Sequence, residues 1–152
     1  MAIYYIPMGA SLATVTNDAD QDVWELLAPS DAAVKIHWIK LTSTLTTDER
    51  VMLRLMRRTA AGSGGGTGLV EVLADGTSAA IGTSVIPLVT TPGTAGDILL
   101  TDYWSQLAPW EYLPTPETRI VVPPSGRIGL NLQTAVAASR TWSGFIVIEE
   151  IG

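Results

Sequence analysis

The chain has 152 residues, no cysteine and a formal net charge of −6. This length suits one domain with a hydrophobic core, and the missing cysteines exclude disulfides, thiolate metal sites and cysteine nucleophiles. The acidic balance argues against a nucleic-acid partner, because lysine and arginine are needed to neutralise phosphates.

Charged residues make up only 16% of the chain, against roughly 25% in ordinary soluble domains. We therefore expect partners to cover part of the surface. The N-terminus lacks the basic region and long apolar stretch of a signal peptide, so synthesis without export is expected. The sequence holds no apolar window of 18 residues, and no membrane span is expected.

The first predicted strand is Ile3–Ile6, which Pro7 closes. It is short, apolar and preceded by only two residues. We interpret residues 1–8 as a candidate N-terminal arm that pairs with a neighbouring subunit or another partner. The candidate interface residues in it are Ile3, Tyr4 and Tyr5.

Three further strands are predicted at Leu12–Thr16, Val23–Ala28 and Val34–Thr42. The last alternates along its length, which is the period of a strand. We expect one face to carry Val34, Ile36 and Trp38, and the other His37, Ile39 and Leu41. Both faces are largely apolar, which favours a central strand or one bordering an interface. The tryptophans on predicted strands are expected in the core: Trp24, Trp38 and Trp142.

An acidic turn separates two of these strands, and its Asp18, Asp20 and Asp22 have the spacing that opens a calcium loop. Val23 stands where that loop needs glycine, and Pro29 where it needs a bidentate glutamate. We therefore predict a solvated turn and no metal site, with a weak cation site as the alternative.

Thr47–Arg58 has two readings. A threonine cap followed by early carboxylates is typical of a helix start. Val51, Leu53 and Leu55 alternate with polar or longer side chains, which indicates a strand. We predict the strand, with a short helix as the alternative.

Five glycines lie within seven positions at Gly62–Gly68. A Walker loop needs a lysine near its end, and Gly66-Thr67-Gly68 has none. A dinucleotide loop needs a helix after it, whereas the following residues, Leu69–Leu73, read as a strand. We predict a flexible surface loop and no nucleotide or other cofactor.

Residues 74–99 are rich in Thr, Ala, Gly and Ser, and predict a long excursion with one weak strand at Ser84–Val89. Arg119–Val122 and Arg127–Leu132 flank Pro-Pro-Ser-Gly and predict a hairpin. Thr141–Ile151 is the last strand. About eight to ten strands with long crossovers predict an all-β, jelly-roll-like two-sheet β-sandwich, with residues 1–152 as a single domain.

Tyr103–Pro116 holds too much proline for a regular central strand. Tryptophan and tyrosine are enriched at protein interfaces, and this segment holds four of them. One alternative is stacking on sugar rings, and another is a loop folded back over one end of the sandwich. The candidate interface residues here are Tyr103, Trp104, Trp110 and Tyr112.

His37 is the only histidine, and no serine or aspartate lies near it in the sequence. A packed strand histidine, or one at a subunit contact, fits better than a general base. Glu149 and Glu150 are adjacent in a predicted strand, so they point to opposite faces and cannot form a carboxylate pair. The sequence therefore predicts no catalytic residues and a protein that is not an enzyme.

Five segments together resemble small structural proteins of tailed bacteriophages and prophages. They are Asp22–Pro29, Lys35–Leu41, Arg57–Thr67, Pro109–Glu117 and Ile148–Gly152. Their order and spacing carry the resemblance, since none of them encodes chemistry.

The resemblance implies a head decoration, or cement, protein of jelly-roll type. Such a protein is expected to form a homotrimer on the outer surface of the virion capsid, to bind the major capsid protein and to stabilise the expanded shell. The alternatives are a head–tail connector or tail component, and a carbohydrate- or receptor-binding jelly roll.

Overall fold

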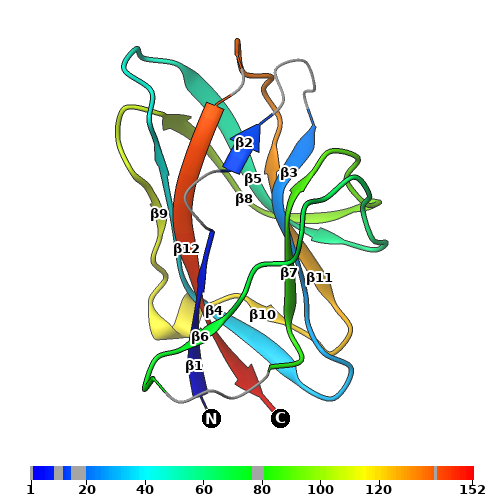
Figure 1. The fold of residues 1–152 in the computed structure, drawn as a ribbon. Coiled ribbons are helices and arrows are strands. Elements are labelled where there is room, and N and C mark those ends of the chain that lie inside the picture. Colours follow the sequence, from blue (N-terminus) through cyan, green and yellow to red (C-terminus); the bar gives the residue numbers. More distant parts are fainter. Residues whose placement is uncertain (1, 9–11, 15–19, 77–80, 139) are drawn as a thin grey trace.

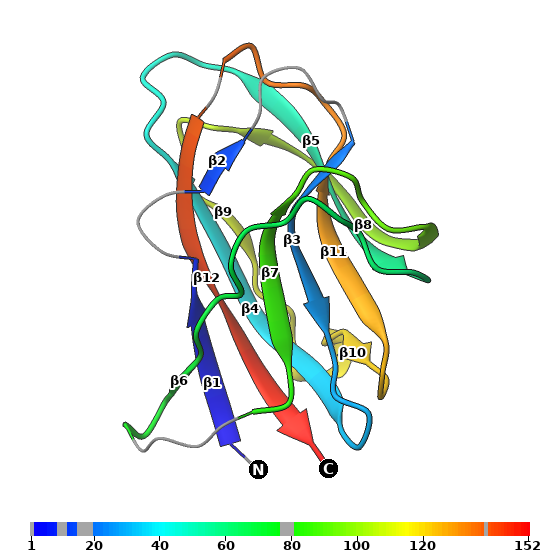
Figure 2. The ribbon, with the colours of Figure 1, turned by 45° about the vertical axis from the view of Figure 1, so that its right-hand side comes forward.

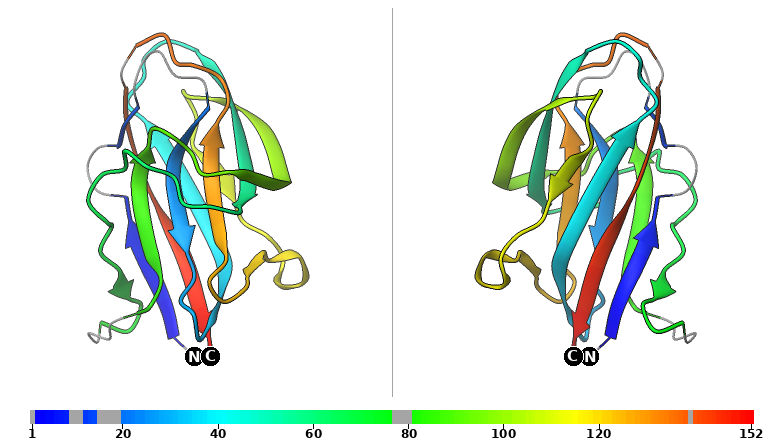
Figure 3. Two further views of the ribbon diagram at one scale, coloured as in Figure 1. Left: turned by 90° about the vertical axis from the view of Figure 1, so that its right-hand side faces the viewer. Right: turned by 90° about the vertical axis from the view of Figure 1, so that its left-hand side faces the viewer.

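The computed structural model describes residues 2–8, 12–14, 20–76, 81–138 and 140–152. Strands dominate these ranges, and the only helix among them is the short 3-10 helix η1, Pro116–Thr118. The strands form two antiparallel sheets that pack face to face in a β-sandwich (Figures 1 and 2). Both ends of the chain lie at the same end of the sandwich (Figure 3).

The first sheet has the order β10-β4-β12-β1-β6, and the short strands β2 and β9 pair with β12 and β4. Its members are β1 (Ala2–Pro7), β2 (Leu12–Thr14), β4 (Ala33–Ser43), β6 (Val72–Leu73), β9 (Trp110–Tyr112), β10 (Val121–Val122) and β12 (Arg140–Ile151).

The second sheet has the order β7-β3-β11-β5-β8. Its members are β3 (Gln21–Leu27), β5 (Arg50–Arg58), β7 (Ser84–Val89), β8 (Ala95–Ser105) and β11 (Arg127–Leu132).

The pairing is nested, which is the topology of a jelly roll. β1 pairs with β12, β3 with β11, β4 with β9 and β10, and β5 with β8. The chain therefore has the topology of one long antiparallel hairpin whose strand pairs are divided between two sheets. The predicted jelly-roll-like sandwich of a single domain is confirmed.

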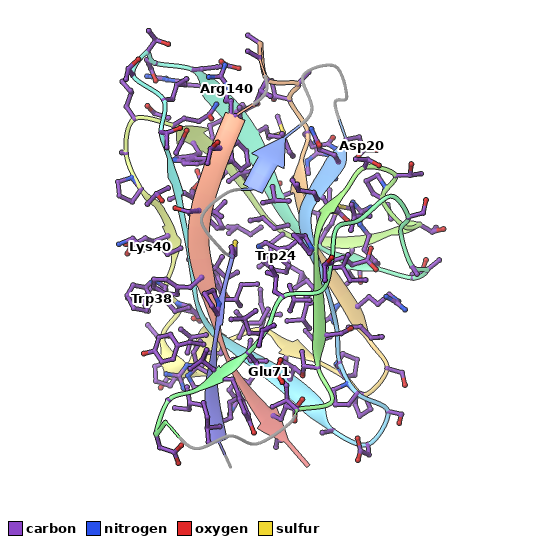
Figure 4. All side chains as sticks on the ribbon, in the orientation of Figure 1. Asp20, Trp24, Trp38, Lys40, Glu71 and Arg140 are labelled. Carbon is purple, nitrogen blue, oxygen red and sulfur yellow. The ribbon has the colours of Figure 1, made fainter. Side chains whose placement is uncertain are left out.

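The core lies between the sheets and takes one face of each strand. Trp24 sits at its centre, between the two layers (Figure 4), and is fully buried. Trp142 is also fully buried, so the predicted core position is confirmed for Trp24 and Trp142 but not for Trp38. Val51, Leu53 and Leu55 of β5 point into the same core, so the predicted strand is confirmed and the helical alternative is excluded.

The predicted faces of β4 are wrong beyond Ile36. Ile148 of β12 pairs with Ile36, and the preceding Val147 pairs with Trp38, so His37 is an extra residue in a β-bulge. The bulge reverses the alternation: Ile39 and Leu41 join Val34 and Ile36 in the core. Trp38 therefore lies on the outer side of the sheet and is only half-buried (Figure 4).

The predicted arm is also corrected. β1 is held on both sides within its own chain, by β12 and by β6. Tyr4 and Ile6 point into the core, while Ile3 and Tyr5 point outward. Residues 2–7 are therefore a regular strand of the first sheet.

The predicted hairpin around Pro-Pro-Ser-Gly is wrong, because its two strands lie in different sheets. β10 pairs with β4 in the first sheet, and β11 lies between β3 and β5 in the second. A turn closed by the Gly126 N–H and the Pro123 carbonyl, 2.8 Å apart, carries the chain across. The turn chemistry was correct, but it does not specify which strands pair.

The glycine-rich segment lies along the free edge of β7 and is not a loose loop. Ser63 forms a bridge with Thr91, and the Gly66 and Leu69 N–H groups donate to the Pro87 and Val85 carbonyls. Glycine is required for this close approach, because a Cβ at Gly65 would lie 2.3 Å from the Ile86 side chain.

Candidate interaction surface

The outer side of the first sheet carries apolar side chains in a continuous row across four strands. Val72 of β6 pairs with Tyr5 of β1, Tyr5 with Val147 of β12, and Val147 with Trp38 of β4. We call this side the outer face of the first sheet. Its outward-pointing apolar residues are Ile3, Tyr5, Trp38, Val72, Val121, Phe145 and Val147.

Aromatic rings pack against one another in the middle of this face. The Phe145 ring lies edge-on to Trp38, with centroids 4.6 Å apart, and is tilted against Tyr5 at 6.1 Å. Offset and edge-to-face arrangements of this kind are the favourable ones for aromatic pairs. Val147 lies in the same row and is buried, although it points away from the core. The rings are thus fixed in place and present a preformed apolar surface.

On either side of this row, the outer face carries charged side chains that pair with each other. Lys40 Nζ lies 3.0 Å from Glu111 Oε1, and 6.0 Å from the centroid of the Trp38 ring. On the other side, Glu149 Oε2 is bound by His37 Nε2 at 2.9 Å and approached by Lys35 Nζ at 3.5 Å. These five side chains are therefore paired with one another within the chain, whereas the aromatic rings beside them are apolar.

The hydrogen bond from His37 lowers the pKa of Glu149, and Lys35 lowers it further, against the opposing effect of burial. Glu149 is therefore ionised at neutral pH although its side chain is nearly buried. Glu150 points the other way and accepts a hydrogen bond from the Thr83 N–H. The prediction that these two carboxylates lie on opposite faces is confirmed.

The candidate interface residues fall into three groups, which are exposed, buried and half-buried. Ile3 and Tyr5 are each 42% exposed, and Tyr103 on β8 is 67% exposed. Tyr4, Trp104 and Trp110 are buried in the core, so their side chains are not available on the surface of this chain. Tyr112 is half-buried, and burial raises its pKa.

The two buried tryptophans of this group point into the core, Trp104 from β8 and Trp110 from β9. The Trp104 ring meets Trp142 edge-on at 5.0 Å, and its Nε1 donates to the Ala108 carbonyl at 2.6 Å. Trp110 Nε1 donates to Asp102 Oδ2 at 2.9 Å. All four aromatic residues of Tyr103–Pro116 lie on β8 or β9, so they do not belong to a loop that folds back over one end of the sandwich.

The acidic turn contributes to a buried polar network on the second sheet. Arg58 Nε donates to Asp22 Oδ2 at 2.9 Å, and the side chains of both are almost fully buried. Asp20 accepts hydrogen bonds from Asn131 and Gln133. Asp18 lies outside the described residues. Across the ranges that the structure describes, His, Asp and Glu side chains form no group of three that could hold a metal ion.

Sequence reasoning missed Phe145, Trp38 and Val72 as members of the surface. The alternation in Thr141–Ile151 placed Phe145 opposite Ile146 and Ile148, which is a usable signal for an outward ring. The bulge at His37 has no such signal in the sequence, and this bulge turns Trp38 outward.

Among the residues that the structure describes, no helix is long and apolar enough to cross a membrane.

The chain matches no family model, no curated protein and no solved structure.

Proposed function

We propose that this chain is a non-enzymatic structural protein of a tailed-phage virion, which binds the outer surface of the head and stabilises the expanded shell. The segments that resemble such proteins lie on β3, β4, the β5 end with the glycine-rich segment, β9 and the end of β12. The jelly-roll fold of the chain is compatible with that resemblance.

The observation that carries the proposal is the outer face of the first sheet. It combines fixed aromatic rings with charges that are already paired, so binding gains apolar burial without stripping unpaired charges of water. A protein that binds a protein shell needs apolar contacts, and it does not need basic residues that neutralise phosphates. Three copies in a trimer would each present this face, and weak contacts would add through their effective concentration.

The test is binding to undecorated, expanded phage heads. The purified protein is mixed with heads, and the bound amount is measured after sedimentation at increasing concentrations. We expect saturable binding and greater resistance of the heads to heat. The absence of binding to expanded heads would contradict the proposal and favour a connector or tail role.

Two variants test whether the outer face of the first sheet is the surface that contacts the heads. Tyr5→Lys places a charge in the middle of the aromatic row and should weaken head binding at least tenfold. Leu107→Lys changes a side chain of similar exposure, 53%, in the turn after β8 and should leave it unchanged. Equal loss in both variants would show that the outer face is not the contact.

The carbohydrate-binding alternative receives less support from the structure. The sugar-stacking alternative rests on the aromatic residues of Tyr103–Pro116, and the rings of Trp104 and Trp110 lie in the core. A sugar platform needs exposed ring faces. Binding of the chain to a glycan array, lost on changing an exposed aromatic residue such as Tyr5, would restore this alternative.

A further inference from the structure

His37 is an extra residue in an otherwise regular strand. Its neighbours on β4 pair with consecutive residues of β12, Ile36 with Ile148 and Trp38 with Val147. No residue of β12 stands opposite His37, which is the arrangement of a β-bulge. Without this one residue, the pairing on either side would join into a continuous ladder.

The core does not require the inserted residue. If position 37 were absent, Ile36 and Ile39 would still point inward with Trp38 between them pointing outward, because side chains alternate along a strand. All three already have these directions in the fold. The packing between the sheets therefore does not depend on the bulge. Bulges commonly aim a side chain at a functional site, and here that side chain lies on the outer face of the first sheet.

On that face the insertion supplies an imidazole beside a carboxylate. His37 Nε2 lies 2.9 Å from Glu149 Oε2, and Lys35 Nζ lies 3.5 Å from the same oxygen. The hydrogen bond lowers the pKa of Glu149, so the carboxyl group is ionised at neutral pH and can only accept. Nε2 therefore donates, and it carries the proton of the neutral ring.

The second ring nitrogen of His37 is left as an acceptor. In neutral imidazole one nitrogen donates and the other accepts, so Nδ1 holds a lone pair. Within the described part of the chain, Nδ1 forms no hydrogen bond and is not one of the enclosed polar atoms that lack a partner. The side chain is 16% exposed. A group from outside the chain can therefore reach Nδ1.

The position of this acceptor links it to the apolar residues of the outer face. His37 is followed directly by Trp38, whose ring packs edge-on against Phe145 at 4.6 Å. Glu149 pairs on its other side with Ile3 of β1, which is 42% exposed. The acceptor thus lies among apolar side chains. A hydrogen bond there would give direction to contacts that are otherwise non-directional.

We propose that His37 is the specificity-determining residue of the outer face, and that its Nδ1 accepts a hydrogen bond from an N–H or O–H group of the shell protein. This inference rests on the proposed function and deepens it. Apolar rings gain free energy on almost any apolar surface, whereas a fixed acceptor among them favours a surface with a donor at the matching point. A surface without that donor would leave Nδ1 desolvated and unpaired.

His37→Gln separates the roles of the two ring nitrogens. The amide nitrogen of glutamine can replace the imidazole Nε2 and donate to Glu149, whereas no atom of glutamine occupies the position of Nδ1. We therefore expect the variant to unfold at nearly the same urea concentration as the unmodified chain. It should bind expanded heads at least tenfold more weakly. Arg50→Gln, at a 75% exposed side chain of the second sheet, is the matched control and should bind as the unmodified chain.

Two further measurements use the unmodified chain, in which His37 is the only histidine. Nitrogen NMR of the imidazole in mildly alkaline buffer should show a protonated Nε2 and an unprotonated Nδ1. Diethyl pyrocarbonate, which reacts with unprotonated imidazole nitrogens, should modify His37 in the free chain. Bound heads should slow this reaction in proportion to the bound fraction. This protection decides the matter even if His37→Gln fails to fold.

Three results would overturn the inference: a proton on Nδ1 in mildly alkaline buffer, head binding by His37→Gln equal to that of the unmodified chain, or modification of His37 that bound heads do not slow. An unmodified chain that does not bind heads contradicts the proposed function and the inference together. An unmodified chain that binds, with His37→Gln binding equally, contradicts the inference alone. The two failures are therefore distinguishable.

Discussion

Asp22 and Arg58 form a buried ion pair in the second sheet. Their side chains are 0% and 2% exposed, and Arg58 also donates to the Gly93 carbonyl. The neighbouring Gly129 leaves room for the pair, because a Cβ there would lie 2.6 Å from Asp22 Oδ2. The pair therefore ties β3 and β5 together across β11.

Removing one partner of this pair should be strongly destabilising. Asp22→Asn leaves the Arg58 guanidinium buried without a counter-charge, and we expect the free energy of unfolding to fall by about 3–5 kcal/mol. The measurement is urea unfolding followed by tryptophan fluorescence. The control is Glu111→Gln, which breaks the solvent-exposed pair with Lys40 and should cost about 0–1 kcal/mol. Equal losses would contradict the assignment.

The His37–Glu149 hydrogen bond makes stability depend on pH in the acid range. The pKa of Glu149 is lower in the folded chain than its ordinary value of 4.5, so the unfolded chain takes up the proton first as pH falls. The stabilisation is therefore complete above that value and is lost as pH falls through the folded pKa.

A carboxyl NMR titration of Glu149 tests this account. In His37→Phe the imidazole donor is absent, and the midpoint of Glu149 should move upward. Lys35→Met should move it less, because the His37 hydrogen bond is the largest cause of the shift. An unchanged midpoint in His37→Phe would show that the contact does not set the pKa.

At the scale of the strand, the bulge at His37 decides which tryptophan is structural. Trp24 is fully buried between the sheets, and Trp38 is half-buried on the outer side (Figure 4). Trp24→Ala should lower the free energy of unfolding by about 3–5 kcal/mol. Trp38→Ala should lower it by less than half as much, because its ring already meets solvent. Comparable losses in denaturant unfolding would indicate that β4 lacks the bulge.

The strands with a clear two-residue period were predictable from sequence. Ser84–Val89 has the predicted bounds, and Arg50–Arg58 was recovered within the wider predicted segment. β8 was missed because its apolar residues fall on both faces, as expected for an edge strand with register shifts against β5. A hydrophobic pattern reflects which side chains are buried, and few side chains of the edge strand β8 are buried.

The candidate surface was predictable only in part, for a related reason. Ile3 and Tyr5 were recognised from an apolar strand near the terminus, and both are exposed. Trp104 and Trp110 were expected at an interface because aromatic residues are common there. Composition does not show the direction in which a side chain points, and hydrogen bonds to Ala108 and Asp102 hold these two rings inside.

At the scale of the whole molecule, the jelly roll separates two surfaces. The outer face of the first sheet carries fixed aromatic rings, and the second sheet ends in the open edge of β8. These two features belong to different sheets, and only 16% of the residues of the chain are charged.

Cryo-electron microscopy of expanded phage heads saturated with this protein tests the proposed function most directly. We predict added density on the outside of the shell at its three-fold and quasi-three-fold positions, into which the jelly roll fits. Heads whose surface density is identical with and without the protein would contradict the account.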